Sequence, residues 1–140
     1  MRTVVVHLRN ATQALIEDFL ARTYTRQKGP PWICDVDGDP CLYIHIYRDM
    51  ELEFEPEEIA QLRDELGGEP TVSIAADVSG RHEGGKQVRE FVFKLLTEFE
   101  GLAEDEYTKG FWTLDEVMSK SKKRDRASGR ERTFFDYRQP

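Results

Sequence analysis

The sequence lacks a long hydrophobic run, since no apolar stretch among its 140 residues approaches the roughly 20 residues of a membrane span. The first residues, MRTVVVHLRN, are too short and too polar for a secretory signal and predict a strand instead. With 39% hydrophobic, 34% charged and 11% aromatic residues, the composition is typical of one globular domain with a proper core. We therefore expect a cytoplasmic protein without a membrane partner.

Cysteine and histidine are also scarce, with two and three residues. Cys34 and Cys41 flank the hairpin turn DVDGDP, and pairing across this turn sets Cys41 opposite Val36 and Cys34 opposite Tyr43. The two cysteines are then diagonal neighbours about 7–8 Å apart at their backbones, which is too far for an unstrained disulfide. Since no Cys-x-x-Cys pair is present either, the sequence predicts two reduced, buried thiols. We predict no metal site and no cofactor.

The net charge of −7 is distributed unevenly along the chain. Residues 119–140 contain eight Lys and Arg against three Asp and Glu, a net charge of +5. Residues 1–118 contain 12 basic and 24 acidic residues, a net charge of −12. An acidic body of this kind repels nucleic acid and attracts basic surfaces, so we expect no nucleic-acid partner. The alternative interpretation is that the charge serves only solubility.

The hydrophobic periodicity predicts a strand, a helix, two strands, a second helix, a fourth strand and then further helices. This β-α-β-β-α-β order is typical of the ferredoxin-like arrangement, in which two helices cover one face of an antiparallel sheet. We predict an α+β fold of this type with additional C-terminal helices, formed by residues 1–118, and a basic, flexible tail over residues 119–140. The expected strands are 2–9, 32–36, 41–48 and 71–79, and the expected helices are 12–24, 56–68, 84–101 and a short one from Thr113.

Sheet alternation divides the hairpin residues between two faces. We expect the first two helices to cover the face formed by Leu42, Ile44 and Ile46. The opposite face is too aromatic to lie bare in water, so either the 84–101 helix or another protein covers it. The wide apolar stripe of that helix favours the first option. The residues expected on this second face are Trp32, Cys34, Val36, Cys41, Tyr43, His45 and Tyr47.

The stretch SGRHEGGKQ, residues 79–87, is similar to a phosphate-binding loop, because Gly80, Gly85 and Lys86 reproduce the spacing G-x-x-x-x-G-K. Gln87, however, replaces the hydroxyl that holds magnesium, and Glu83 places a carboxylate where phosphate oxygens would lie. Such nucleotide sites also need a parallel sheet, whereas the sheet expected here is antiparallel. We therefore predict an ordinary turn before a helix. The side chains of this turn expected to project into solvent are Arg81, His82 and Glu83.

The best candidate for catalysis is the pair His45 and Asp77, which alternation places on one sheet face. A second histidine, His7, would lie on a neighbouring strand of the same face. An imidazole beside a carboxylate suits acid–base chemistry, but no nucleophile, oxyanion loop or third metal ligand accompanies the pair. The alternative function is therefore a small enzyme or ligand-binding regulator that uses this face. If the histidines have no such function, we expect their imidazoles to be packed or hydrogen-bonded within the fold.

Residues 104–112 combine carboxylates with aromatic side chains, directly before the capping box Thr113-x-x-Glu116. Tyr and Trp supply rigid contact area, and acids next to them suit recognition of a basic protein surface. The alternative is that the aromatic residues pin this connector to the core while the acids are only solvated. The candidate partner-binding residues of this stretch are Glu104, Asp105, Glu106, Tyr107, Phe111 and Trp112.

The stretch VSGRHEGGKQVREFVFKLLTEFEGLAEDEYTKGFWTLDEV, residues 78–117, resembles the C-terminal half of small bacterial proteins associated with secreted polymorphic toxins. The shared features are an S-G-R turn at 79–81, a helix ending in F-x-G at 99–101, an acidic D-x-Y stretch at 105–107 and a W-T-L-x-E helix start at 112–116. The N-terminal half is unmatched. The resemblance implies an immunity protein, a non-catalytic inhibitor that binds a cognate toxin in the producer's own cytoplasm.

An acidic body suits a basic toxin such as a nuclease, because complementary charge speeds encounter and buried aromatic contacts slow release. We therefore predict that the chain is not an enzyme and that it binds its toxin through residues 79–83 and 104–112. A homodimer that uses the aromatic sheet face is a further alternative.

Overall fold

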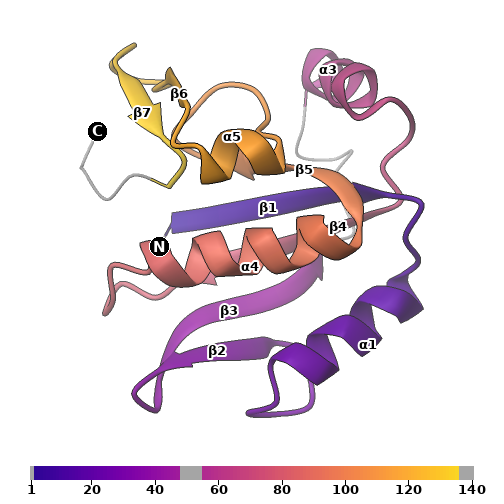
Figure 1. Cartoon of the computed structure of the whole chain (residues 1–140), viewed down its shortest axis with the longest axis vertical. Helices are drawn as coiled ribbons and strands as arrows, with labels where there is room; N and C mark the ends of the chain where they lie inside the picture. Colours follow the sequence, from indigo (N-terminus) through magenta and orange to yellow (C-terminus); the bar gives the residue numbers. More distant parts are fainter. Residues whose placement is uncertain (1, 48–54, 136–140) are drawn as a thin grey trace.

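A five-stranded antiparallel sheet of order β2-β3-β4-β1-β5 runs through the structure, a computed structural model that describes residues 2–47 and 55–135 (Figure 1). Its strands are β1 (Arg2–Arg9), β2 (Trp32–Val36), β3 (Asp39–Tyr47), β4 (Val72–Val78) and β5 (Glu100–Asp105). The described helices are α1 (Gln13–Thr23), α3 (Pro56–Leu66), α4 (Gly85–Glu98) and α5 (Leu114–Met118), and a small hairpin is formed by β6 (Lys122–Arg124) and β7 (Glu131–Thr133). None of these helices is both long enough and apolar enough to cross a membrane.

The α+β class and the antiparallel sheet are confirmed, whereas the ferredoxin-like strand order is not. β4 lies between β3 and β1 and pairs antiparallel with both. β1 in turn pairs with β5, an edge strand that the sequence pattern did not predict. The reason is that EGLAED lacks a clean alternation of polar and apolar residues, so its strand conformation comes from pairing with β1 and not from a local signal.

α1 and α4 cover one face of the sheet and bury their apolar stripes against it (Figure 1). Thr12 caps α1, because its hydroxyl accepts a hydrogen bond from the Leu15 N–H at 3.2 Å. Gly84 precedes α4 with a φ of 80°, and a side chain there would lie 2.6 Å from Val78 Cγ1, so this position needs glycine. Fully buried residues at this layer include Val4, Val6, Ile16, Leu20, Ile44, Ile74, Phe91, Val92 and Leu95.

The predicted hairpin register is wrong by one residue. The prediction that α4 covers the aromatic second face of the sheet is also wrong, because α4 packs on the face of Leu42 and Ile44. Cys34 pairs with Leu42 and Trp32 pairs with Ile44, because a bulge lies between Cys34 and Asp35. The shift turns Trp32 and Cys34 toward the core under α1 and α4, since a one-residue slip exchanges the faces of a strand. Val36 and Cys41 also contact this core. Of the residues expected on the second face, Tyr43, His45 and Tyr47 remain there, and Ile33 joins them opposite Tyr43.

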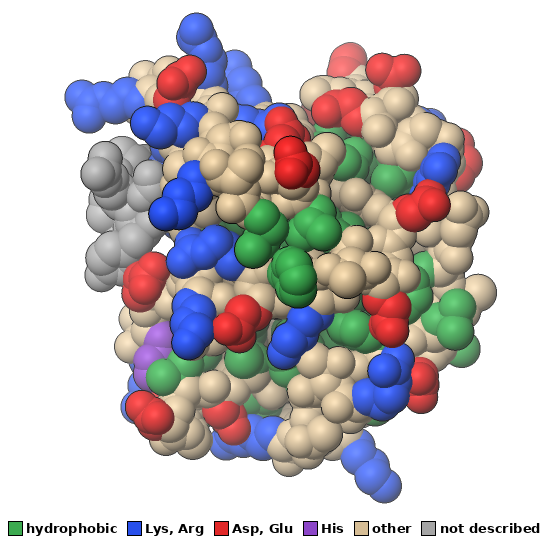
Figure 2. Space-filling view, viewed as in Figure 1, with side chains coloured by type: hydrophobic (Ala, Val, Ile, Leu, Met, Phe, Trp, Pro, Cys, Tyr) green, Lys and Arg blue, Asp and Glu red, His purple; other side chains and the backbone are tan. Residues whose placement is uncertain are grey.

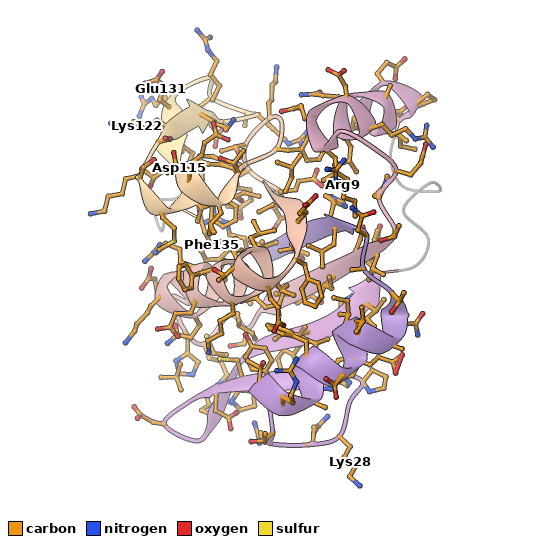
Figure 3. The ribbon with its side chains drawn as sticks, turned by 45° about the vertical axis from the view of Figure 1, so that its right-hand side comes forward. Arg9, Lys28, Asp115, Lys122, Glu131 and Phe135 are labelled. Carbon is orange, nitrogen blue, oxygen red and sulfur yellow. The ribbon has the colours of Figure 1, made fainter. Side chains whose placement is uncertain are left out.

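α3 lies on this second face of the sheet, near its β5 edge. Leu102 of β5 packs with α3, while its neighbour Ala103 belongs to the core under α4, so α3 and α4 cover opposite faces. Arg9 of β1 fastens the end of α3, because its Nη1 donates a hydrogen bond to the Gly67 carbonyl oxygen at 2.6 Å (Figure 3). The residues of this second core cluster are Leu62, Leu66, Leu102 and Phe111.

Residues 119–135, which the charge pattern assigned to a flexible tail, are folded against the rest of the chain. β6 and β7 pair with each other, and Arg132 Nη1 donates a hydrogen bond to Asp125 Oδ2 at 2.7 Å. Phe134 and Phe135 are each 2% exposed and belong to the main core (Figure 3). The basic segment is therefore docked by its aromatic residues up to residue 135. Arg48 of the expected third strand and residues 136–140 of the tail lie outside the described residues.

Candidate functional site

A cleft of about 350 Å³ opens on the sheet face that carries α3. Its floor comes from neighbouring strands, because alternate residues of β3, β4, β1 and β5 point to this face. The described residues that line it include three carboxylates and one imidazole but no lysine or arginine, so the cleft is acidic. The lining residues are Thr3, Val5, His45, Tyr47, Ala75, Asp77, Glu104 and Glu106.

The predicted pair His45 and Asp77 is brought together at this cleft. His45 Nδ1 lies 3.7 Å from Asp77 Oδ2, which is too long for a hydrogen bond. The other oxygen of Asp77 accepts a hydrogen bond from Thr3 Oγ1 at 2.6 Å. Asp77 is therefore oriented by Thr3, and His45 is an electrostatic neighbour that does not share a proton with it directly.

Behind the cleft, Ser73, His7 and Glu104 form a buried chain that the sequence pattern did not reveal. His7 Nδ1 lies 2.8 Å from Ser73 Oγ, and His7 Nε2 lies 2.9 Å from Glu104 Oε1. The order of hydroxyl, imidazole and carboxylate is like that of a hydrolase, but His7 is fully buried and Ser73 is only 4% exposed, so a substrate cannot reach the hydroxyl. The chain instead holds Glu104 in place. The sequence contains one hint of this chain, because His7 and Ser73 are each the single polar residue in an apolar run, VVVHL and VSIAA.

The three predicted binding acids at 104–106 do not share one surface. Glu104 and Glu106 line the cleft, and Glu106 is exposed. Asp105 points to the other face of β5, where its fully buried carboxylate accepts hydrogen bonds from Arg2 Nη2 at 2.9 Å and from the Phe135 N–H at 2.8 Å. Asp105 is therefore an internal structural residue, and its carboxylate is not available to a partner.

Phe111 and Trp112 pin the connector after β5 to the core, whereas Tyr107 packs against arginine side chains. Trp112 is fully buried, and its Nε1 donates a hydrogen bond to Thr108 Oγ1 at 3.0 Å. Phe111 is 4% exposed and packs beneath α3. Tyr107 is half-buried under the Arg2 guanidinium, which lies 4.3 Å from the ring centroid. Phe111 and Trp112 are thus unavailable as anchors for a partner.

The loop of residues 79–83 is fastened to the turn of the β2–β3 hairpin. His82 Nε2 lies 2.7 Å from one oxygen of Asp39, and Arg81 Nη1 lies 3.2 Å from the other. The side chains of Arg81 and Glu83 are exposed, so they remain available for contact. Because two carboxylates, Asp39 and Glu83, belong to this region, it disfavours a phosphate group and has the character of an ordinary turn.

A second acidic feature lies on α3, whose acids the sequence pattern indicated only as a helix-start signal. Residues 55–69 contain six Asp and Glu against one Arg, a net charge of −5. Because residues seven apart share one side of a helix, the pairs 57/64 and 58/65 form one surface, which faces away from the buried Ile59 and Leu66. Figure 2 shows acidic side chains gathered at the upper right, where α3 lies in Figure 1, and basic side chains at the upper left, where the C-terminal hairpin lies. We name Glu57, Glu58, Asp64 and Glu65 the α3 acidic surface; none of them forms an ion pair with another described residue.

Neither cysteine is a candidate nucleophile. Burial raises the pKa of Cys41 to about 11, and burial also raises the pKa of Cys34. Both thiols are therefore protonated near neutral pH, and a protonated thiol is a poor nucleophile and metal ligand. Within residues 2–47 and 55–135, no group of three or more His, Cys, Asp and Glu is arranged to hold a metal ion.

Comparison of this chain with protein families, with characterised proteins and with solved structures finds no match. The function must therefore be inferred from the geometry and charge of the chain itself. Its two candidate features are the acidic cleft and the α3 acidic surface, which lie on the same side of the sheet. Both present carboxylates, and the hydroxyl of the one hydrolase-like chain is closed to substrate.

Proposed function

We propose that this chain is a non-catalytic binding protein of the immunity type, which neutralises a basic toxin domain by binding it directly. The observation that carries the proposal is the α3 acidic surface, whose carboxylates have no ion-pair partner among the described residues. It lies on the same side of the sheet as the acidic cleft, so one basic partner can contact both. The resemblance of residues 78–117 to toxin-associated bacterial proteins supports the same class of function.

The two acidic features contribute to binding in different ways. Carboxylates at the surface of α3, of which Glu57, Asp64 and Glu65 are exposed, attract a basic protein over a distance and speed association, although each contributes little affinity. Affinity requires contacts that exclude water, and the cleft provides a concave place for them. Asp77 is already oriented there by Thr3. Glu104 is oriented by His7, and its second oxygen lies 3.6 Å from Arg126 Nη2, which a basic side chain of the partner would replace. A lysine or arginine of the toxin therefore meets acceptors that need little further ordering.

The test uses the full chain as affinity bait in its native host, with identification of the captured protein by mass spectrometry. We expect a basic protein that is toxic when expressed alone and harmless when this chain is co-expressed. Binding is then measured for a variant that neutralises the α3 acidic surface. Its association rate should fall roughly tenfold and depend less steeply on salt than that of the wild type. The variant combines Glu57→Gln, Glu58→Gln, Asp64→Asn and Glu65→Gln.

A matched control removes the same number of exposed charges from other elements of the molecule, through Glu17→Gln, Asp37→Asn, Asp115→Asn and Glu131→Gln. This control should associate at close to the wild-type rate. Equal slowing of both variants would mean that overall charge, and not α3, guides binding. Capture of an acidic or harmless protein would reject the immunity proposal itself.

A second candidate function is binding of a small ligand in the cleft, favoured by a volume of about 350 Å³ and by the contact between His45 and Asp77. A regulator or enzyme of this kind requires His45, so His45→Ala should abolish any ligand-induced rise in melting temperature or any turnover. The immunity proposal does not require this imidazole. Toxin protection that survives His45→Ala supports immunity, and protection lost together with ligand binding supports the second candidate.

A further inference from the structure

We propose that the outward face of α4 binds a second copy of this chain in an antiparallel, two-fold symmetric arrangement. Four charged residues at a spacing of four alternate in sign along the helix and form a ridge. All four are exposed, and Figure 2 shows blue and red side chains alternating along the face where α4 lies in Figure 1. This α4 charge ridge consists of Lys86, Glu90, Lys94 and Glu98.

The α4 charge ridge is not neutralised within its own helix. Residues four apart on a helix can form ion pairs, but none joins any two of these four described residues. Glu98 lies 3.7 Å from Arg22 of α1, and Lys94 lies 5.9 Å from the ring centroid of Tyr24. Glu90, near the middle of the ridge, forms no ion pair in the part of the chain that the structure describes. The centre of the ridge is therefore available to a partner.

The order of positive and negative charges along α4 favours one orientation and one register of the two copies of this helix. In an antiparallel pair whose two-fold axis crosses the outward face of α4 at the height of residue 92, Lys86 lies opposite Glu98 of the second copy. In the same register Glu90 lies opposite Lys94 of the second copy, and symmetry makes each contact occur twice. A parallel pair would set Lys86 against Lys86, and an antiparallel pair shifted by one turn would set Glu90 against Glu90. Charge complementarity therefore favours one orientation and one register.

Apolar side chains on the α5 side of the ridge give this contact a hydrophobic part. Phe93 is 45% exposed, and Met118 of α5 is 49% exposed. Phe93 lies on the same side of α4 as Leu96, which lines a surface depression together with Leu114 of α5. A two-fold axis at the height of residue 92, on the outward face of α4, brings the two copies of Phe93 together, so the contact covers an exposed aromatic ring. Figure 2 shows an apolar patch where α4 and α5 meet.

The size of the surface predicts a reversible dimer. α4 contains 14 residues and is therefore about 21 Å long. A helix of this length with its α5 border is smaller than the roughly 800 Å² per partner of a stable complex. We therefore expect association that depends on protein concentration and weakens at high salt. The ridge lies on the opposite sheet face from the cleft and α3, so a dimer leaves both of those features open.

The test is analytical ultracentrifugation of the full chain over a concentration series at low salt. Glu90→Lys replaces two attractive contacts by two repulsive ones, so the dissociation constant should rise at least roughly tenfold. Adding Lys94→Glu to this variant restores opposite charges in the antiparallel register. The double variant should return to within about threefold of wild type, since the two positions act as one contact. Phe93→Ser should also weaken association.

Glu17→Lys reverses an exposed charge on α1 away from the ridge and should leave association unchanged. Circular dichroism shows whether each variant remains folded, and the rescue by the double variant separates a lost contact from a damaged helix. A wild-type chain that stays monomeric at every concentration overturns the proposal. So does a dimer that Glu90→Lys leaves intact or that the double variant fails to restore. These outcomes are independent of toxin binding, because the substitutions lie on the other face.

Discussion

Asp105 accepts a hydrogen bond from the backbone N–H of Phe135 at 2.8 Å, across 30 residues of chain. Arg2 Nη2 donates to the same carboxylate at 2.9 Å, and the Arg2 guanidinium lies 4.0 Å from the ring centroid of Phe135. One buried acid therefore joins the first strand of the sheet, its β5 edge and the C-terminal segment. This contact explains why a basic, polar stretch ends inside the core.

Asp105→Ala should destabilise the whole chain. The change removes the Asp105 carboxylate from the Arg2 guanidinium in a largely buried site, and it removes the acceptor of the Phe135 N–H. Breaking a buried ion pair on one side lowers the free energy of unfolding by about 3 kcal/mol or more. Urea denaturation measures this loss, with Glu106→Ala at the exposed neighbour as the control, expected within about 1 kcal/mol of wild type. A small loss for Asp105→Ala would mean that the phenyl rings alone hold the segment.

Trp112 is predicted to act on stability and not on partner binding. It is fully buried, so Trp112→Ala should lower the free energy of unfolding by about 3–5 kcal/mol. Trp112→Phe keeps most of the volume but loses the hydrogen bond to Thr108, at a cost of about 1–2 kcal/mol. Thermal denaturation tests both values, and toxin affinity of the folded Trp112→Phe variant should equal that of wild type. A weaker affinity with unchanged stability would contradict this role.

Local periodicity was enough to predict the elements that bury one continuous face. In α4 the residues Val88, Phe91, Val92 and Leu95 recur at helical spacing, and all of them are buried against the sheet. β1 and β4 are rich in β-branched and small apolar residues, and both lie inside the sheet where such residues pack well. In these elements the positions of the apolar residues in the sequence directly predict which side of the element is buried.

Register and contacts between distant segments could not be predicted in this way. The bulge between Cys34 and Asp35 shifts the hairpin by one residue, and no local signal marks it. Glu104 and Asp105 acquire their roles from His7 and Arg2, which lie 97 and 103 residues away in sequence. A one-dimensional pattern cannot show such pairs, because strand order decides which residues meet. For the same reason alternation predicted the His45 and Asp77 part of the cleft but not its closure by Glu104 and Glu106, since four strands supply its lining.

Cys41 should be almost unreactive in the folded chain. Burial raises its pKa to about 11, so at pH 8 only about one Cys41 side chain in a thousand is a thiolate. Labelling with a disulfide reagent should be at least roughly a hundredfold slower than in the urea-unfolded chain. A Cys34→Ser variant isolates the Cys41 signal, and in the wild type the half-buried Cys34 should react first. Rapid labelling of both thiols in the folded state would contradict the burial of Cys41.

The acid side of the stability profile should depend on Asp125. Its carboxylate accepts hydrogen bonds from the Ser128 N–H at 2.8 Å and from Arg132 Nη1 at 2.7 Å. These bonds hold the pKa of Asp125 well below its usual range. Because the folded pKa lies below the unfolded value of about 3.9, the stabilisation is fully present above that value and is lost as the pH falls through the folded pKa.

We therefore expect the β6–β7 hairpin to lose stability as the pH falls below about 4. Asp125→Asn cannot ionise, so its melting temperature should lie below that of wild type at neutral pH, and the difference should shrink as the solution becomes acidic. Thermal unfolding over a pH series measures this difference, and Asp115→Asn, at an exposed acid of α5, is the control that should show none of it. Wild-type and Asp125→Asn curves that stay parallel into the acid range would show that the Asp125 carboxylate does not stabilise the fold through its charge.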